Sequence, residues 1–156
     1  MRIENLMTQN PRRARVHDHL DAIAREMWEG DCGAVPVIDD EGRLAGIITD
    51  RDVCMAAYTQ GKPLRDIPVT VAMTRQVVSV SVQDTIEAAE HIMRRECVRR
   101  LPVIDRDGRP VGILSLSDLV REAVHDGHDG APHAADVAQV LADICEPRFQ
   151  VAPSAA

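Results

Sequence analysis

Val35-Pro36-Val37-Ile38-Asp39 and Leu101-Pro102-Val103-Ile104-Asp105 are near-identical stretches that lie 66 positions apart in a chain of 156 residues. Shifting the sequence by this offset aligns further segments without a gap. They are Met7-Thr8 with Met73-Thr74, Gly42-Arg43 with Gly108-Arg109, Gly46-Ile47 with Gly112-Ile113, and Asp52-Val53 with Asp118-Leu119. An internal repeat that keeps one register over this length indicates two copies of one structural unit.

Each copy carries the pattern of a β-α-β-β-α unit, which is clearest in the second. A β-branched run at 77–80 is followed by Asp84, which we expect to start a helix. The apolar runs 101–104 and 111–114 indicate two strands, joined by a hairpin turn at Asp105-Arg106-Asp107-Gly108. A closing helix follows the second of these strands.

The repeat also sets the expected domain boundaries. They are 7–60 for the first repeat, 61–72 for a linker, 73–124 for the second repeat, and 125–156 for a C-terminal extension with a helix at about 133–144. In the first repeat, Asp18 starts the first helix and the opening strand is weaker. A unit of about 50 residues buries too little apolar surface to be stable alone. We therefore expect an α+β sandwich in which the two units share a core.

Composition excludes several classes of function. The chain is 45% hydrophobic and 28% charged, as in soluble globular proteins, and its net charge is −7. An acidic chain with 2% aromatic residues suits neither the phosphate backbone of nucleic acids nor base stacking. The sequence shows no apolar run of membrane-spanning length and no secretory leader, so we expect a cytoplasmic protein with reduced cysteines.

The paired segments 33–52 and 100–118, each preceded by Met-Thr, resemble tandem CBS domains, the regulatory repeats named after cystathionine β-synthase. Such a pair is called a Bateman module. The resemblance covers about residues 7–124. It implies a pseudo-twofold sandwich with two clefts between the repeats, which typically bind adenosine-containing ligands such as AMP, ADP, ATP or S-adenosylmethionine.

The family signature places a hydroxyl residue and an aspartate at the end of the third strand of each repeat. Carried over, these are Thr49 and Asp52 in the first repeat, and Ser115 and Asp118 in the second. A carboxylate can accept hydrogen bonds from both ribose hydroxyls, and a hydroxyl beside free helix N–H groups suits a phosphate; Ser117 could share that part. The alternative is that these residues are ordinary helix N-caps.

Arginines are the expected phosphate ligands, since a guanidinium can grip a phosphate with two hydrogen bonds. Arg99 and Arg100 lie just before a strand of the second repeat, where the first repeat has uncharged residues and offers Arg51 instead. We therefore expect the cleft of the second repeat to be the more phosphate-selective, unless this cluster is simply a solvated helix end. The adenine would be held by aliphatic walls, with three candidates: Ala34, Ile47 and Ile113.

The repeats consume nearly the whole chain, so we expect a ligand-sensing regulator without an obligatory cofactor rather than an enzyme. An adenosine nucleotide would act as its regulatory ligand, a homodimer would form through the CBS helices, and an effector protein would receive the signal. Nucleic acid and membrane are not expected partners. The alternatives are a constitutive dimerisation scaffold with vacant clefts, a sensor of S-adenosylmethionine-type ligands, or metal-assisted chemistry at His125, His128 and His133.

Overall fold

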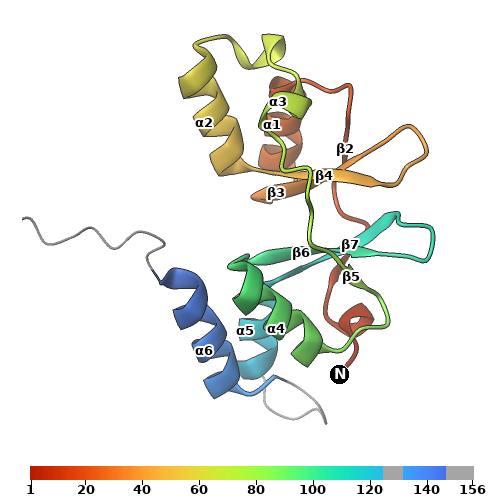
Figure 1. Ribbon diagram of the computed structural model, residues 1–156, viewed down its shortest axis with the longest axis vertical. Coiled ribbons are helices and arrows are strands. Elements are labelled where there is room, and N and C mark those ends of the chain that lie inside the picture. Colours follow the sequence, from red (N-terminus) through yellow and green to blue (C-terminus); the bar gives the residue numbers. More distant parts are fainter. Residues whose placement is uncertain (125–131, 147–156) are drawn as a thin grey trace, which may run out of the picture.

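The computed structural model describes residues 1–124 and 132–146 of the chain. The two repeats form two stacked units, whose strands face each other in the middle and whose helices lie outside (Figure 1). The first unit contains β2 (Ala14–Arg15), α1 (Leu20–Glu29), β3 (Ala34–Ile38), β4 (Leu44–Thr49) and α2 (Asp50–Gln60). The second contains β5 (Val80–Ser81), α4 (Ile86–Glu96), β6 (Arg100–Ile104), β7 (Pro110–Ser115) and α5 (Leu116–Val124). The predicted β-α-β-β-α order is thus confirmed in both repeats.

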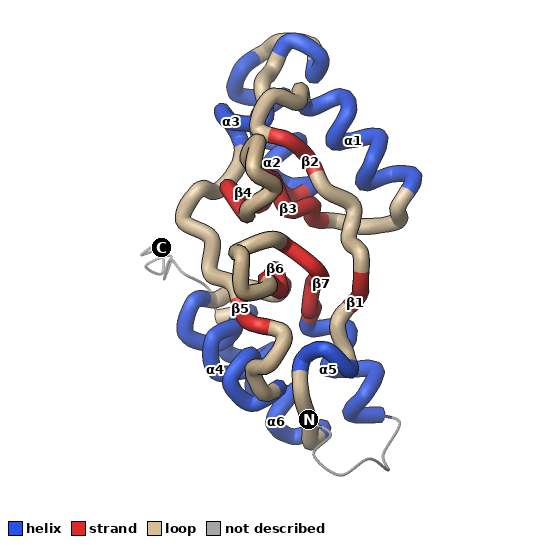
Figure 2. The backbone as a smooth tube through the Cα atoms, turned by 90° about the vertical axis from the view of Figure 1, so that its right-hand side faces the viewer, coloured by secondary structure: helices blue, strands red, loops and turns tan. Residues whose placement is uncertain are grey.

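The segment that opens each repeat pairs with the sheet of the other repeat. Strand β1 (Thr8–Gln9) precedes the first unit but pairs antiparallel with β7, giving the sheet order β1-β7-β6-β5 (Figure 2). In the same way Thr74 forms a bridge with Ile47 at the edge of the sheet β2-β3-β4. Each Met-Thr segment therefore pairs with the sheet of the other unit, and these contacts link the two units.

A glycine on each receiving strand makes this pairing possible. A Cβ atom at Gly46 of β4 would lie 2.7 Å from the sulfur of Met73 and 3.0 Å from the carbonyl oxygen of Thr74. A Cβ atom at Gly112 of β7 would meet the sulfur of Met7 in the same way. Only glycine leaves room for a backbone to approach so closely. The paired Gly-Ile and Met-Thr motifs are thus two sides of one contact.

The expected linker at 61–72 is largely built into the first unit. It contains the 3-10 turn η2 (Leu64–Asp66) and the short helix α3 (Val69–Ala72). Ile67 and Val69 are buried in the core of the first unit. At the N-terminus, Ile3 of η1 (Ile3–Asn5) is buried in the core of the second unit. Each unit therefore has its own core, rather than the shared core that we expected from the short repeats. Both cores are aliphatic, as the low aromatic content predicts.

Local signals predicted the hairpins well and the helix starts less well. Gly42 and Gly108 close the two hairpins with φ of 81° and 76°, which glycine adopts without strain. Helix α4 is capped by Thr85, whose hydroxyl accepts from the N–H of Ala88, and not by Asp84. Asp84 instead accepts from the N–H of Ser81 and closes the turn before the helix, as Asp18 does in the first repeat.

The C-terminal helix α6 (Ala134–Cys145) packs against α4 and α5 of the second unit (Figure 2). Val137 and Val140 enter the core, and the guanidinium of Arg94 donates to a carboxylate oxygen of Asp143 over 2.6 Å. No helix in the described part of the chain is long and apolar enough to span a membrane. Of the three C-terminal histidines, His125 and His128 lie outside the described residues, and His133 is exposed.

Candidate functional site

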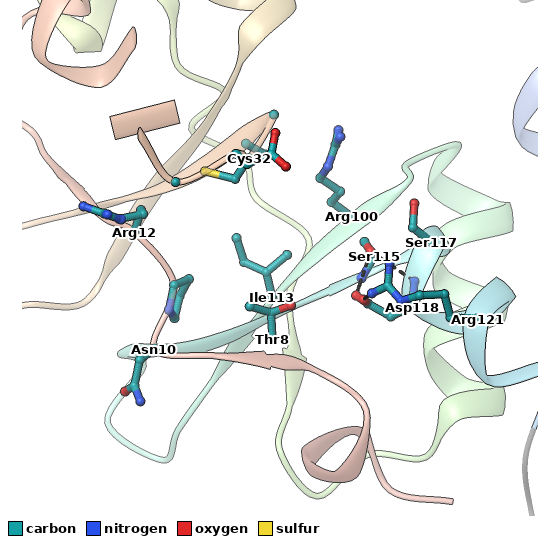
Figure 3. Close-up of a pocket in the computed structure, with 15 residues that line it drawn as sticks. Thr8, Asn10, Arg12, Cys32, Arg100, Ile113, Ser115, Ser117, Asp118 and Arg121 are labelled. Atoms are coloured by element: carbon teal, nitrogen blue, oxygen red, sulfur yellow. Dashed lines mark hydrogen bonds and ion pairs between the residues drawn. The ribbon is translucent and has the colours of Figure 1, made fainter. Parts of the chain in front are cut away.

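Two clefts lie between the units, one at each signature segment. We call the first the Thr49 cleft; its cavity of about 330 Å³ contains Thr49 and Asp52 at the start of α2. We call the second the Ser115 cleft; its cavity of about 460 Å³ contains Ser115 and Asp118 at the start of α5 (Figure 3). Both volumes fall within the range of about 300–1,000 Å³ that small-molecule sites occupy.

The two clefts are images of each other under the 66-residue shift. Corresponding lining residues of the Thr49 and Ser115 clefts are Ile47 and Ile113, Thr49 and Ser115, Asp52 and Asp118, Thr74 and Thr8, Gln76 and Asn10, Val98 and Cys32, and Arg100 and Ala34. Each cleft therefore takes its signature residues from one repeat and its opposite wall from the other. The pseudo-twofold relation thus holds for these seven pairs of positions, although the side chains differ at several of them.

All eleven residues singled out in the sequence line at least one cleft. Ile47, Thr49, Arg51, Asp52 and Arg99 line the Thr49 cleft alone of the two. Ala34, Ile113, Ser115, Ser117 and Asp118 line the Ser115 cleft, and Arg100 lines both. Because each cleft takes one wall from each repeat, Arg99 of the second repeat lies beside the signature of the first repeat. The position of Arg99 in the second repeat did not by itself suggest this.

Further residues line the clefts that motif matching missed. Val77, Val78 and Val98 form an apolar wall of the Thr49 cleft. Arg12 and Arg121 line the Ser115 cleft. The signal that could have found them is the 66-residue shift, applied to positions outside the signature.

The signature of the Thr49 cleft is a capping box. Oδ2 of Asp52 accepts from the backbone N–H of Thr49 over 2.8 Å and from its hydroxyl over 2.7 Å. The hydroxyl oxygen of Thr49 in turn accepts from the N–H of Asp52 over 3.2 Å. Within the described residues, Oδ1 of Asp52 has no hydrogen-bond partner. N-cap and ligand site are thus compatible here, because capping occupies only one carboxylate oxygen.

The Ser115 cleft differs at the second oxygen. Oδ2 of Asp118 accepts from the N–H and hydroxyl of Ser115 over 2.8 and 2.6 Å, as in the first repeat. Its Oδ1, however, forms an ion pair with Arg121 one turn along α5 (Figure 3). The Asp118 side chain is only 5% exposed. Both oxygens of this carboxylate therefore have a partner within the protein, unlike those of Asp52.

The hydroxyl and amide donors expected to meet a phosphate are mostly engaged. The hydroxyls of Thr49 and Ser115 both donate to their aspartates. At the start of α2, the N–H of Asp50 donates to the carbonyl of Gly33, and the N–H of Arg51 donates to the Asp50 carboxylate. The hydroxyls thus position the aspartates, and side-chain cations are left as the principal anion ligands.

The arginines differ in how free they are. Arg12 pairs with Glu26 over 2.9 Å, and Arg121 pairs with Asp118. By contrast, Arg51, Arg99 and Arg100 form no ion pair with any described carboxylate. The Thr49 cleft therefore holds three unpaired guanidinium groups, whereas the Ser115 cleft holds one, that of Arg100.

Cys32 lies in the Ser115 cleft, and burial raises the pKa of its thiol. Among residues 1–124 and 132–146, no three His, Cys, Asp or Glu side chains gather into a possible metal site.

This pair of pseudo-symmetric clefts between two β-α-β-β-α units defines a CBS domain pair. The model of the CBS domain family matches residues 3–58 and 64–125, so the chain belongs to this family. A pair of CBS domains is a regulatory module rather than a catalytic one.

Two similar proteins show the range of the relatives. The chain is 37% identical over 103 residues to the uncharacterized protein MJ1404 of Methanocaldococcus jannaschii, covering 66% of this chain and 24% of that protein. It is 30% identical over 131 residues to hypoxic response protein 1 of Mycobacterium tuberculosis, covering 84% and 85%.

Solved structures agree with this assignment. A structure of hypoxic response protein I with two coordinated zinc ions matches with a TM-score of 0.70 and 29% identity over 78% of this chain and 98% of that one. The CBS domain pair of protein MJ0100, in complex with 5-methylthioadenosine and S-adenosyl-L-methionine, matches with a TM-score of 0.74 over 81% and 98%. At 22% identity, the latter likeness concerns the fold alone.

Proposed function

We propose that this chain is a regulatory sensor that binds an adenosine nucleotide in the Thr49 cleft and signals its presence to a partner protein. The observation that carries the proposal is the unpartnered Oδ1 of Asp52, a residue that lines a cavity of about 330 Å³. A partly buried carboxylate oxygen without a donor suits the vicinal hydroxyls of a ribose, which supply two donors.

The opposite wall of this cleft suits a purine. Ile47, Val77 and Val98 are only partly buried although they are apolar, so ligand binding would remove more of their surface from water. Aliphatic contacts on both ring faces can hold adenine without aromatic stacking. The apolar wall and the ribose-binding carboxylate thus lie in one cavity.

The phosphate of a nucleotide would meet unpaired arginines. Arg51 and Arg99 are exposed at the Thr49 cleft and Arg100 is half-buried between the two clefts. Each guanidinium can form charge-assisted hydrogen bonds to phosphate without losing an internal ion pair. Our proposal thus differs from the expectation, drawn from the sequence, that the cleft of the second repeat is the more phosphate-selective.

An S-adenosylmethionine-type ligand is the second candidate, and the complex of the MJ0100 pair with two adenosyl ligands favours it. The arginines separate the two candidates. S-adenosylmethionine offers these guanidinium groups one carboxylate and also brings a sulfonium and an ammonium charge, which they repel. A nucleotide phosphate brings only negative charge and gains more from them. We therefore rank the nucleotide first.

Calorimetric titration with AMP, ATP and S-adenosylmethionine tests the proposal. We expect a nucleotide to bind the wild-type chain, and Asp52→Ala to weaken the tightest binding by about tenfold or more. Asp118→Ala is the matched control and should have a smaller effect, because its carboxylate is already paired. Absence of binding by every adenosine ligand would favour the alternative of a constitutive scaffold.

We propose that the helices transmit the signal of the bound ligand to the partner protein. We propose a homodimer that packs through α1 and α2, because α6 covers α4 and α5 whereas Trp28 and Tyr58 on the first pair are 87% and 83% exposed. Large exposed aromatic side chains are typical of interfaces. Light scattering should show a dimer that Tyr58→Glu dissociates and Val124→Glu, on the exposed end of α5, does not; a wild-type monomer contradicts this.

A further inference from the structure

We propose that Arg100 is shared by the two clefts, so that an anionic ligand bound in one cleft weakens the binding of an anionic ligand in the other. Arg100 begins β6 and lines the Thr49 cleft, the Ser115 cleft, and a third cavity of about 420 Å³ beside the start of α5. Figure 3 shows its side chain extending from the second unit toward the first, apart from the cluster of Ser115, Asp118 and Arg121.

Gly33 makes room for this position. A Cβ atom at Gly33 would lie 3.0 Å from Nη2 of Arg100 and 3.1 Å from Oδ2 of Asp50. The guanidinium therefore reaches across the boundary between the repeats to the backbone that precedes β3. Under the 66-residue shift, Gly33 and Ala34 take the places of Arg99 and Arg100, so the first repeat supplies no second arginine of this kind.

The clefts depend on Arg100 to different degrees. The Thr49 cleft also holds Arg51 and Arg99, neither of which pairs with a described carboxylate. In the Ser115 cleft, Arg12 and Arg121 are committed to Glu26 and Asp118. Arg100 is thus the one unpaired cation among the described residues of that cleft.

Sharing follows from the directionality of the guanidinium. Its planar set of donors grips a phosphate well in one orientation, and an Arg100 turned toward one cleft is withdrawn from the other. A phosphate bound at the first cleft therefore weakens the binding of a second. A neutral nucleoside has no phosphate for Arg100 to bind, so two nucleoside molecules bind the two clefts independently of each other.

This inference rests on the proposed function, and a cycle of two ligands and two substitutions tests it. AMP and adenosine differ only in the phosphate. In the wild-type chain, the second AMP enters the Ser115 cleft after Arg100 has been taken. In Asp52→Ala, whose Thr49 cleft is expected to bind AMP at least about tenfold more weakly, we expect the Ser115 cleft to bind AMP about tenfold more tightly than that second site of the wild type.

The same comparison in an Arg100→Ala background should show no such difference for AMP, and adenosine should show none in either background. Arg106→Ala, which removes an exposed hairpin arginine that lines neither cleft, is the control for charge and should preserve the AMP effect.

The outcomes separate the two proposals. Three outcomes would overturn the sharing of Arg100. The first is an equal AMP dissociation constant for the Ser115 cleft in the wild type and in Asp52→Ala. The others are loss of all AMP binding in Asp52→Ala and an AMP effect that persists in the Arg100→Ala background. Failure of the wild-type chain to bind either AMP or adenosine overturns the proposed function instead.

Discussion

Arg121 forms an ion pair with Asp118, whereas the same place one turn after Asp52 holds Met55. One difference between the copies thus decides whether the second oxygen of the signature carboxylate, which we propose binds ribose, is paired within the protein or free. The two clefts have equivalent backbones but differ in whether the second oxygen of the signature aspartate already has a partner.

Arg121→Met should convert the Ser115 cleft into a closer copy of the Thr49 cleft. Because Oδ1 of Asp118 loses its internal partner, we expect adenosine to bind the Ser115 cleft about tenfold more tightly. Calorimetry of the Asp52→Ala chain, with and without Arg121→Met, isolates that cleft. Arg106→Met removes the same charge elsewhere, and an equal gain from it would show that the ion pair does not matter.

Gly33→Ala should displace the guanidinium of Arg100 without disturbing the cores. Its Cβ would lie 3.0 Å from Nη2, which is a tight contact with the end of a flexible side chain. We expect AMP affinity to fall by several-fold, while adenosine affinity and the unfolding midpoint stay nearly constant. An equal loss for both ligands would point instead to a general distortion of the cleft.

Helix α6 should stabilise the second unit through its buried face. Val140 is 1% exposed and Leu141 is 44% exposed on the same helix. Val140→Ala should therefore lower the free energy of unfolding by about 2 kcal/mol, and Leu141→Ala by less than about 0.5 kcal/mol. Urea denaturation measures both, and equal losses would mean that α6 does not dock as described.

Glu90 should make the stability of the α4–α6 contact pH-dependent. It is 9% exposed, and its Oε1 has no hydrogen-bond partner within the described residues. Burial raises the pKa of Glu90 above its ordinary value of 4.5, as do Asp136 of α6 and Glu87 of α4, while Arg94 and His133 oppose this rise. Because folding favours the protonated form, stability is lost as the pH rises from about 4.5 through the folded-state pKa.

Glu90→Gln removes the charge and keeps the shape. We expect thermal unfolding of this variant to shift upward by a few degrees at pH 8 and to match the wild type near pH 4. Glu87→Gln, close to the start of the same helix, is the comparison. A benefit that is the same at both pH values would contradict a titrating Glu90.

Much of the fold could be predicted because its signals are local. The apolar runs, the hairpin glycines and the repeat itself act over short stretches of chain, and the element order follows from them. The helix starts were harder. Asp18, Asp84 and Thr85 lie so close together that turn closure and capping compete for the same residues, and spacing alone does not rank them.

The sequence by itself determined that two copies of one unit exist, and it named eleven of the residues that line their clefts. Only the tertiary structure decided how those residues are shared. Arg99 lines the cleft that contains the signature of the other repeat, Arg100 lines both clefts, and Arg121 forms an ion pair with Asp118. The reason is that the walls of each cleft are exchanged between units by strand contacts such as that of Thr74 with Ile47. Such pairing depends on backbone approach in space, which no periodicity along the chain encodes.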